Sequence, residues 1–459
     1  MVFRRWAYRI AMTPAFLFMW SSRALYYLGF EGGIHAVFFL LRFFFLAYFV
    51  APSMIAVLAR VILSHRVDFF VPYGPCRRQD FDVVFPPAKL QVRGCVICFA
   101  GGAWTLSHKS FSAPLVLELV ASGLIVVCVD IRQFPQATAE MQSADVCASI
   151  SAVRSRLDNW GCDPRRLYVI GHSAGAHLLA LSLLKSLATA QNENPVSLGI
   201  RRSFLVSGPY DILSLRPFVQ SRGLPSPFLD ALFLNDDVRF SPTLLAEQLI
   251  KSQPSPIPKT PQKAPRSKML NNHHHHHSRT GSLSNSLFRA SSDLFLWAGR
   301  AMDEEEADLF PPASSLPTSL LDTVDTDTDI ASPPRLSRVS LRHKHALSKL
   351  GSLHLWHGES DITIPPIQAI NFAAALRGTG VTATLNLVQF GTHTSLVLED
   401  PLLGVKTGLL AAVLDAIDLD DASDHGDHSL TLELKQTRSN PKAHLSNWWG
   451  ILVRAANPF

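Results

Sequence analysis

The chain has 459 residues, 47% of them hydrophobic and 17% charged, with a formal net charge of +5 at pH 7. Folded domains seldom grow beyond about 300 residues, so this length allows one large domain and additional segments. Residues 1–75 carry seven Arg against Glu31 and Asp68, a balance of +5 that equals the charge of the whole chain. The remainder is therefore neutral and does not predict a nucleic-acid interface, which needs a basic face. Six Cys in so long a chain do not make a disulfide framework.

An apolar segment near the N-terminus predicts membrane association. Residues 43–59 are 17 residues without a charge, and the apolar run around them extends from Ile34 to Leu63. About 17 to 25 apolar residues are enough for a helix to span a bilayer. The alternative is a pair of amphipathic helices that lie in the interface or cover the core of the next domain. We predict a membrane-associated region with a membrane helix over residues 1–65.

Between residues 79 and 199 short β-branched runs alternate with helical patterns, which is typical of a doubly wound, mostly parallel sheet. The near-continuous apolarity of these runs predicts strands that are covered by helices on both faces. Cys95 and Cys98 form a CxxC pair, but they fall inside one predicted strand, so we interpret them as core residues and predict no metal site. The predicted strands are 81–85, 95–99, 125–130 and 167–170, and the predicted helices are 139–160 and 174–187.

The composition changes after a strand at 203–206 and a helix at 241–250, and the sheet pattern returns later. The intervening stretch is rich in Ser, Pro and short charge runs, which cannot bury enough apolar surface to offset the entropy of ordering. Strands at 352–356 and 384–390 and helices at 366–376 and 404–417 then resume the pattern. The predicted organisation is a membrane-associated region (1–65), the first part of an α/β domain (66–250), a disordered insertion (251–345), the second part of the domain (346–420) and a tail (421–459).

Gly171-His172-Ser173-Ala174-Gly175 follows the predicted strand 167–170 and opens a predicted helix. A G-x-S-x-G motif in this strand, turn and helix context is typical of the nucleophile elbow of an α/β-hydrolase. The turn is too tight for large flanking side chains and exposes the serine hydroxyl to a base. We therefore predict an α/β-hydrolase fold with Ser173 as nucleophile.

A serine hydroxyl needs a histidine to accept its proton and a carboxylate to orient that histidine. Asp361 and His393 each follow a predicted strand, and the chain order Ser, Asp, His is the order found in this fold. Open α/β sheets place their sites at such carboxyl ends. We predict Asp361 as the acid and His393 as the base, with Glu359 as the alternative acid. Three other histidines, His172, His177 and His357, lie near the elbow or a strand end, and we assign them no role.

The segment Gly101-Gly102-Ala103-Trp104 comes directly after the predicted strand 95–99. Small residues let main-chain amides approach a ligand, and a tetrahedral oxyanion is commonly held by such amides together with the amide of the residue after the nucleophile. A glycine pair after a strand is also an ordinary turn. With the triad present, we assign Gly101, Gly102 and Ala174 to an oxyanion hole, and we predict no cofactor.

Four segments of the chain carry a family resemblance: FAGGAW at 99–104, IRQFPQ at 131–136, residues 161–177 and residues 392–404. They resemble the isoprenylcysteine α-carbonyl methylesterases, which are membrane-bound relatives of the hormone-sensitive-lipase-like esterases. The likeness covers roughly residues 60–250 and 350–417, and its most specific parts are the RQFPQ-type and THTxLxLxDPLxG-type segments. Two departures are Phe99-Ala100 ahead of the glycines, where relatives often have His, and His172, where Gln is frequent.

The resemblance implies hydrolysis of the methyl ester of a C-terminal prenylated cysteine, with release of methanol, at endoplasmic reticulum or Golgi membranes. It carries the nucleophile, acid and base onto Ser173, Asp361 and His393, and the oxyanion segment onto Gly101 and Gly102. The partners it implies are an apolar ester substrate and a membrane. Two other hypotheses stay open: a general carboxylesterase, lipase or formamidase-like hydrolase of the same fold, and a catalytically inactive membrane scaffold.

Overall fold

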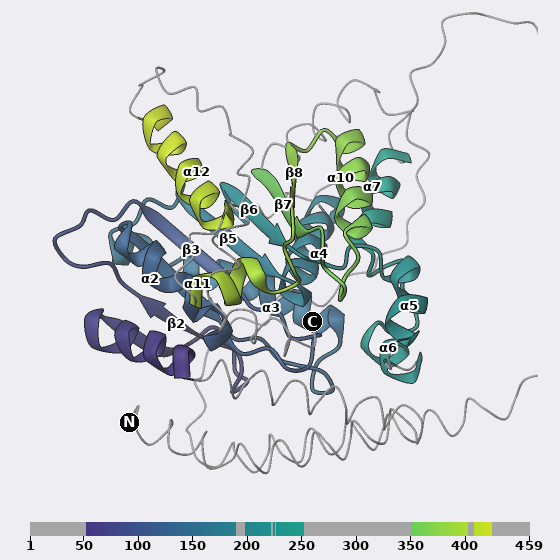
Figure 1. Ribbon diagram of the computed structural model, residues 1–459, viewed down its shortest axis with the longest axis horizontal. Helices are drawn as coiled ribbons and strands as arrows, with labels where there is room; N and C mark the ends of the chain where they lie inside the picture. Colours follow the sequence, from purple (N-terminus) through teal and green to yellow (C-terminus); the bar gives the residue numbers. More distant parts are fainter. Residues whose placement is uncertain are drawn as a thin grey trace, which may run out of the picture. The chain divides into compact units, whose positions relative to one another are not determined.

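The computed structural model describes residues 52–189, 198–221, 224, 226–251, 350–402 and 408–424 (Figure 1). Most of the N-terminal region (1–51), the predicted insertion from 252 onward and the tail from 425 onward lie outside the described residues. The prediction of disorder in the insertion therefore stays a prediction. Of the predicted tail (421–459), residues 421–424 are described and belong to a helix that ends at Asp424.

The described residues form an eight-stranded sheet in the order β1-β2-β4-β3-β5-β6-β7-β8. The pairs β1/β2 and β2/β4 are antiparallel, and every pair from β4 through β3 to β8 is parallel. The prediction of a doubly wound, mostly parallel sheet is thus confirmed. The strands are β1 (Val67–Pro72), β2 (Asp80–Val84), β3 (Gly94–Phe99), β4 (Leu124–Val129), β5 (Leu167–His172), β6 (Arg202–Val206), β7 (Ser352–Gly358) and β8 (Ala383–Val388).

Helices cover both faces of the sheet, as the apolar strands require. Alternate residues of β3 point to opposite faces, so Cys95 and Ile97 belong to one hydrophobic cluster while Val96 and Cys98 belong to the other. Helices α3 (Ala139–Arg154), α4 (Ala174–Thr189), α7 (Pro242–Lys251) and α10 (Ile367–Thr379) pack into the first cluster. Helices α2 (Ala113–Ala121) and α12 (Gly408–Asp424) pack into the second. Two further helices, α5 (Ile212–Ser221) and α6 (Ser226–Leu232), follow β6.

The structure differs from the predicted elements at a few places. Strand β1 and helices α2, α5 and α6 were not predicted. Helix α3 ends at Arg154 rather than at Trp160, and a separate 3₁₀ turn (Asp158–Trp160), closed by Gly161 with a left-handed φ of 71°, forms the rest of the predicted helix. Helix α12 begins four residues after and ends seven residues after the predicted 404–417. Helix α10 is closed by Gly380 with φ 85°, as the sequence indicated.

Residues 52–64 form a helix ahead of β1. Its Val61 is buried against the sheet, whereas Ile55 and Leu63 are 65% and 85% exposed. Within the described ranges, no helix combines the length and the hydropathy that crossing a membrane requires. The predicted span from Ile34 to Leu63 is not tested by this finding, because residues 34–51 are not described.

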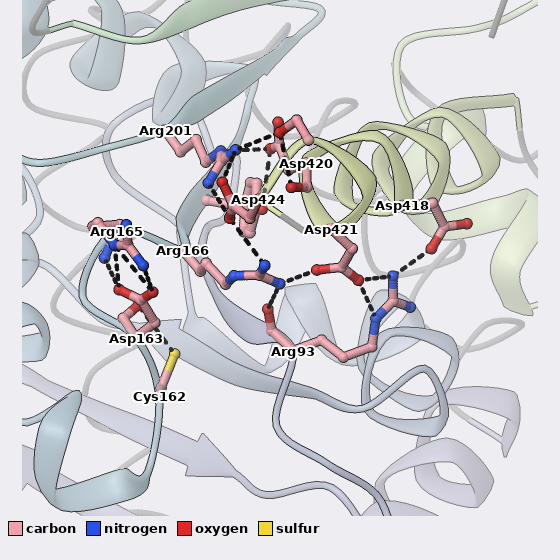
Figure 2. Close-up of polar contacts among 12 residues, drawn as sticks. Arg93, Cys162, Asp163, Arg165, Arg166, Arg201, Asp418, Asp420, Asp421 and Asp424 are labelled. Atoms are coloured by element: carbon pink, nitrogen blue, oxygen red, sulfur yellow. Dashed lines mark hydrogen bonds and ion pairs between the residues drawn. The ribbon is translucent and has the colours of Figure 1, made fainter. Parts of the chain in front are cut away.

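The amino ends of the parallel strands meet the acidic end of α12 (Figure 2). Asp420, whose side chain is 5% exposed, binds the guanidinium groups of Arg201 and Arg202 at 3.0 and 2.5 Å and accepts a hydrogen bond from the Tyr168 hydroxyl. The neighbouring ion pairs join the same elements. They are Arg93 with Asp418 and Asp421, Arg166 with Asp421 and Asp424, and Arg201 with Asp424. These arginines fasten α12 to the ends of β3, β5 and β6.

Candidate active site

Ser173 lies in a sharp turn between β5, which ends at His172, and α4, which begins at Ala174. Its φ of 52° is in the left-handed region, which a residue with a side chain enters only at an energetic cost. A Cβ on Gly171 would lie 2.8 Å from the Ala176 Cα, and one on Gly175 would lie 2.5 Å from the Phe99 carbonyl oxygen. The two glycines of the motif are therefore required by close backbone approach, and the strand, turn and helix context is the predicted one.

The structure brings Ser173, His393 and Asp361 together at the carboxyl edge of the sheet. The Nε2 atom of His393 lies 2.9 Å from the Ser173 Oγ, and its Nδ1 lies 2.8 Å from the Asp361 Oδ2. All three residues are buried. A carboxylate oxygen can only accept, so Nδ1 carries the proton and the lone pair of Nε2 faces the serine hydroxyl. This tautomer is the one that a general base requires.

The Asp361 carboxylate is held from both of its oxygens. Oδ1 accepts the backbone N–H groups of Thr363 and Ile364, both at 2.9 Å. Oδ2 accepts from His393 and also lies 3.2 Å from the Nε2 of His357. Burial by itself raises the pKa of Asp361, but the two imidazoles outweigh it and hold that pKa well below its ordinary value. The acid therefore stays ionised beside the base.

The alternative acid does not reach the site. The Glu359 side chain is exposed, and its backbone N–H donates to the Val388 carbonyl, which joins the ends of β7 and β8. The backbone of Glu359 thus stabilises the loop after β7, whereas the side chain of Asp361, two residues later, is buried and contacts His393.

Two histidines to which the sequence analysis assigned no role touch the triad. His172 donates from Nε2 to the backbone carbonyl of His393 at 2.9 Å, and the two rings are 5.1 Å apart. Burial, and then the neighbouring His393, lower the pKa of His172 to about 3, so it is neutral at ordinary pH. His357 lies at the end of β7 and donates to the Ile364 carbonyl at 2.8 Å, next to the Asp361 contact. The only sequence signals for these contacts are the position of His172 beside the nucleophile and that of His357 four residues before the acid.

Of the predicted oxyanion residues, Gly101 packs against the nucleophile, and Ala174 directly follows it in the chain. A Cβ on Gly101 would come within 2.9 Å of the Ser173 Cβ, and one on Gly102 would lie 2.4 Å from the Ser107 nitrogen, so neither position accommodates a side chain. The turn continues with Ala103 and Trp104, whose φ values of 48° and 62° are both left-handed. Ala174 supplies the first amide of α4. The turn after β3 and the start of α4 thus come from different elements and both lie beside the serine. That their main-chain amides bind an oxyanion stays a prediction.

Among the described side chains, no group of three or more His, Cys, Asp or Glu residues could hold a metal ion. Cys95, Cys98 and Cys128 are free thiols buried in the strands of the sheet, where burial raises their pKa values. Thiols in that state are poor nucleophiles and poor ligands. The chemistry available at the carboxyl edge is that of a serine with its base and acid.

Residues 81–209 match the family described as BD-FAE. The chain is 25% identical over 387 residues to a probable isoprenylcysteine alpha-carbonyl methylesterase of Oryza sativa subsp. japonica, which covers 83% of this chain and 69% of the relative. It is 25% identical over 380 residues to the isoprenylcysteine alpha-carbonyl methylesterase of Arabidopsis thaliana, covering 82% and 67% of the two chains. The chain is a serine carboxylesterase-like α/β-hydrolase. It is similar to the isoprenylcysteine methylesterases over most of its length.

Two other matches are to a formamidase and to an esterase of known structure. A kynurenine formamidase of Danio rerio is 33% identical over 185 residues, which is 38% of this chain and 60% of the relative. Among solved structures, esterase B from Lactobacillus rhamnosis is 14% identical with a TM-score of 0.48, and covers 82% of this chain and 95% of its own.

Proposed function

We propose that this hydrolase cleaves carboxylic esters through Ser173, His393 and Asp361, and that its substrates are C-terminal prenylcysteine methyl esters. The observation that carries the first part is the hydrogen-bonded line from the Asp361 carboxylate through His393 to the Ser173 Oγ, with contacts of 2.8 and 2.9 Å. This line gives the serine an oriented base with the correct tautomer.

In the proposed reaction, the Ser173 Oγ attacks the ester carbonyl carbon while His393 Nε2 accepts the hydroxyl proton. The oxyanion that forms is stabilised by main-chain amides of the Gly101–Gly102 segment and of Ala174. The C–O bond to the methoxy group then breaks, and methanol leaves with the proton from His393. Water, deprotonated by His393, attacks the acyl-enzyme in the same way and releases the free carboxylate and Ser173.

Two observations support a lipid-modified substrate. Two relatives that each cover more than 80% of the chain are named isoprenylcysteine methylesterases. In addition, large apolar side chains are exposed next to the site. Ile362 directly follows the acid and Phe390 comes three residues before the base, and each is 59% exposed. Apolar surface at this edge favours a substrate that brings apolar surface of its own.

We further propose that residues 1–65 hold the enzyme at an endoplasmic reticulum or Golgi membrane. A prenylated ester partitions into the bilayer, so an anchored enzyme would meet its substrate by diffusion in two dimensions. The apolar run from Ile34 to Leu63 supports this proposal. Full-length protein should pellet with membranes and resist extraction by carbonate, and recovery in the supernatant would contradict the anchor without touching the esterase proposal.

The substrate is tested by profiling the full-length enzyme in mild detergent on three compounds. These are farnesylcysteine methyl ester, with the acid product measured by chromatography, p-nitrophenyl butyrate, and N-formylkynurenine. The Ser173→Ala variant is the matched control. We expect the prenylcysteine ester to give the highest kcat/KM, and all turnover to fall by at least about 10⁴-fold in Ser173→Ala.

The second candidate is a formamidase-like amidase, which the match to the Danio rerio formamidase favours. A higher kcat/KM for N-formylkynurenine than for either ester would establish it and reject the methylesterase. If only p-nitrophenyl butyrate is hydrolysed, the enzyme is a general carboxylesterase and the methylesterase proposal is rejected. No Ser173-dependent turnover of any compound, together with no labelling by a fluorophosphonate, would reject the catalytic proposal itself.

A further inference from the structure

The two sides of the oxyanion hole come from different elements. Gly101 and Gly102 belong to the turn after β3, whereas Ala174 begins α4. An oxyanion site works only when its donors are aligned with each other before the reaction starts. Something must therefore fix the turn after β3 relative to the start of α4.

His177 connects these two elements. It lies on α4, and its backbone N–H donates to the Ser173 carbonyl at 3.0 Å, so it belongs to the first turn after the nucleophile. Its Nδ1 lies 3.1 Å from the indole Nε1 of Trp104, and its Nε2 lies 2.8 Å from the carbonyl oxygen of Phe240. His177 has no exposed surface, and Trp104 is 6% exposed. The contact thus runs through a dry part of the protein, where a hydrogen bond is stronger than in water.

The partners leave His177 one possible state. An indole N–H can only donate and a backbone carbonyl can only accept, so Nδ1 must be the lone pair and Nε2 must carry the proton. A second proton on Nδ1 would face the indole N–H of Trp104. Burial lowers the pKa of His177 to about 4, in agreement with a neutral ring.

Trp104 in turn fixes the turn that holds the glycines. Its carbonyl accepts the Phe134 backbone N–H at 2.9 Å and the Gln142 side-chain amide at 3.0 Å, so the residue is held at its backbone and at its ring. The indole packs edge-on against His177 and Phe233, with ring centroids 5.4 and 5.2 Å away. Ala103 and Trp104 both have left-handed φ values, which persist only where the surroundings hold them.

We propose that His177 is a positioning residue for ester hydrolysis, which joins the turn of Gly101 and Gly102 to the helix of the nucleophile through its hydrogen bond to Trp104. It touches no reacting atom. Its effect is to hold the amides of the turn and of Ala174 at fixed relative positions, so that both can donate to the same oxyanion. This inference rests on the proposed esterase activity but not on the identity of the alcohol or acyl group.

The test uses p-nitrophenyl butyrate, full-length protein and four variants: His177→Leu, His177→Asn, Trp104→Phe and the double variant Trp104→Phe/His177→Leu. Turnover is normalised to the serine that a fluorophosphonate titrates, which removes any loss of folded protein. We expect His177→Leu and Trp104→Phe each to lower kcat by about 10- to 100-fold, with KM changed by less than about three-fold, because loss of one oxyanion donor costs about 10² to 10³ in kcat.

Two further comparisons separate positioning from simple structural support. The double variant should be no worse than the poorer single variant within about three-fold, because both substitutions break one contact. His177→Asn should recover most of the activity, since its amide oxygen can accept from Trp104 in place of Nδ1. The affinity for a trifluoromethyl ketone, whose adduct carries an oxyanion, should fall by the same factor as kcat/KM in each variant.

Unchanged kcat per titrated serine in His177→Leu and Trp104→Phe would overturn the proposal, and so would single effects that multiply in the double variant. If His177→Leu does not fold, Trp104→Phe and His177→Asn still decide the question through kcat and inhibitor affinity. Failure of the esterase proposal would look different, because wild-type protein would then be inactive or Ser173→Ala would stay active.

Discussion

The two edges of the sheet use buried aspartates in opposite ways. At the carboxyl edge, Asp361 is 4% exposed and is surrounded by imidazoles and backbone amides. At the amino edge, Asp420 is also 4% exposed, but it is surrounded by Arg201, Arg202 and the Tyr168 hydroxyl. The first set of partners keeps a carboxylate ionised next to groups that can exchange a proton. The second set neutralises the carboxylate with cations that cannot lose one, so it can fasten a helix but cannot take part in acid–base chemistry.

Replacement of the carboxylate by an amide at the carboxyl edge should have the largest effect. Asp361→Asn removes the charge that stabilises the His393 imidazolium and allows the wrong tautomer, so we expect kcat/KM to fall by about 10⁴-fold. The amide keeps the volume and one acceptor for the Thr363 and Ile364 amides, so the midpoint of urea unfolding should change little. Ester hydrolysis and urea denaturation, measured on the same preparation, check both expectations. A variant with more than about a tenth of wild-type activity would show that Asp361 is not the acid.

The same substitution at the amino edge should affect stability instead of activity. Asp420→Asn leaves Arg201 and Arg202 without their buried counter-ion, and breaking a buried ion pair costs about 3 to 5 kcal/mol. We expect the free energy of unfolding to fall by about 3 kcal/mol and kcat to stay within about two-fold of wild type. Asp418→Asn is the matched control, because that side chain is 53% exposed on the same helix. A similar loss of stability in Asp420→Asn and Asp418→Asn would mean that the burial of Asp420 does not make its ion pairs stronger than those of Asp418.

The carboxyl edge could be predicted from sequence and the amino edge could not. Ser173 can be predicted because its turn requires the two glycines of the motif. Asp361 and His393 can be predicted because each follows a strand with a recognisable apolar run. Each of these signals is local. Arg202 and Asp420 are 218 residues apart, and neither lies in a pattern that marks its partner. The pair exists because α12 packs against the amino ends of β5 and β6, which only the packed structure decides.

The same limit applies inside the site. His177 and Trp104 are 73 residues apart, and the hydrogen bond between them follows from the packing of α4 under the turn after β3. The sequence placed His177 within a helix, which is correct, but a helical position alone does not tell what the side chain touches. The unpredicted strand β1 is a similar case, since its pairing with β2 includes a register shift between Asp68 and Val71 that no alternation pattern announces.

Acid should lower the stability of the fold through His354, a buried histidine that belongs neither to the catalytic triad nor to the ion pairs of α12. His354 lies in β7 between the Ser352 and Thr384 hydroxyls, and burial lowers its pKa to about 4, with the nearby Arg202 as the second cause. Between about pH 6.5 and pH 4, His354 is protonated in the unfolded chain but stays neutral in the folded chain. The free energy of unfolding therefore falls as the pH drops through this range. In His354→Leu, the decline between pH 6 and pH 4.5 should be shallower by about 1 kcal/mol per pH unit, somewhat below the limit of about 1.4 for one whole proton. Urea unfolding across that range measures the slope, and identical slopes would exclude His354 as a source of the decline.

The smallest effect is expected at a pair that Figure 2 shows apart from the α12 cluster, Arg165 with Asp163. Its geometry is as good as that of the buried pairs, with an Nη2 to Oδ2 distance of 2.7 Å, but the Arg165 side chain is 78% exposed. Water screens such a pair, and exposed ion pairs often contribute nothing measurable. Arg165→Gln keeps the backbone hydrogen bond to Asp163 at 2.8 Å and should move the Tm by less than about 1 °C. Arg202→Gln, measured alongside, should lower the Tm by several times that amount. An equal fall in Tm in both variants would mean that the positive charges stabilise the amino edge collectively. The burial of Asp420 would then make no separate contribution to stability.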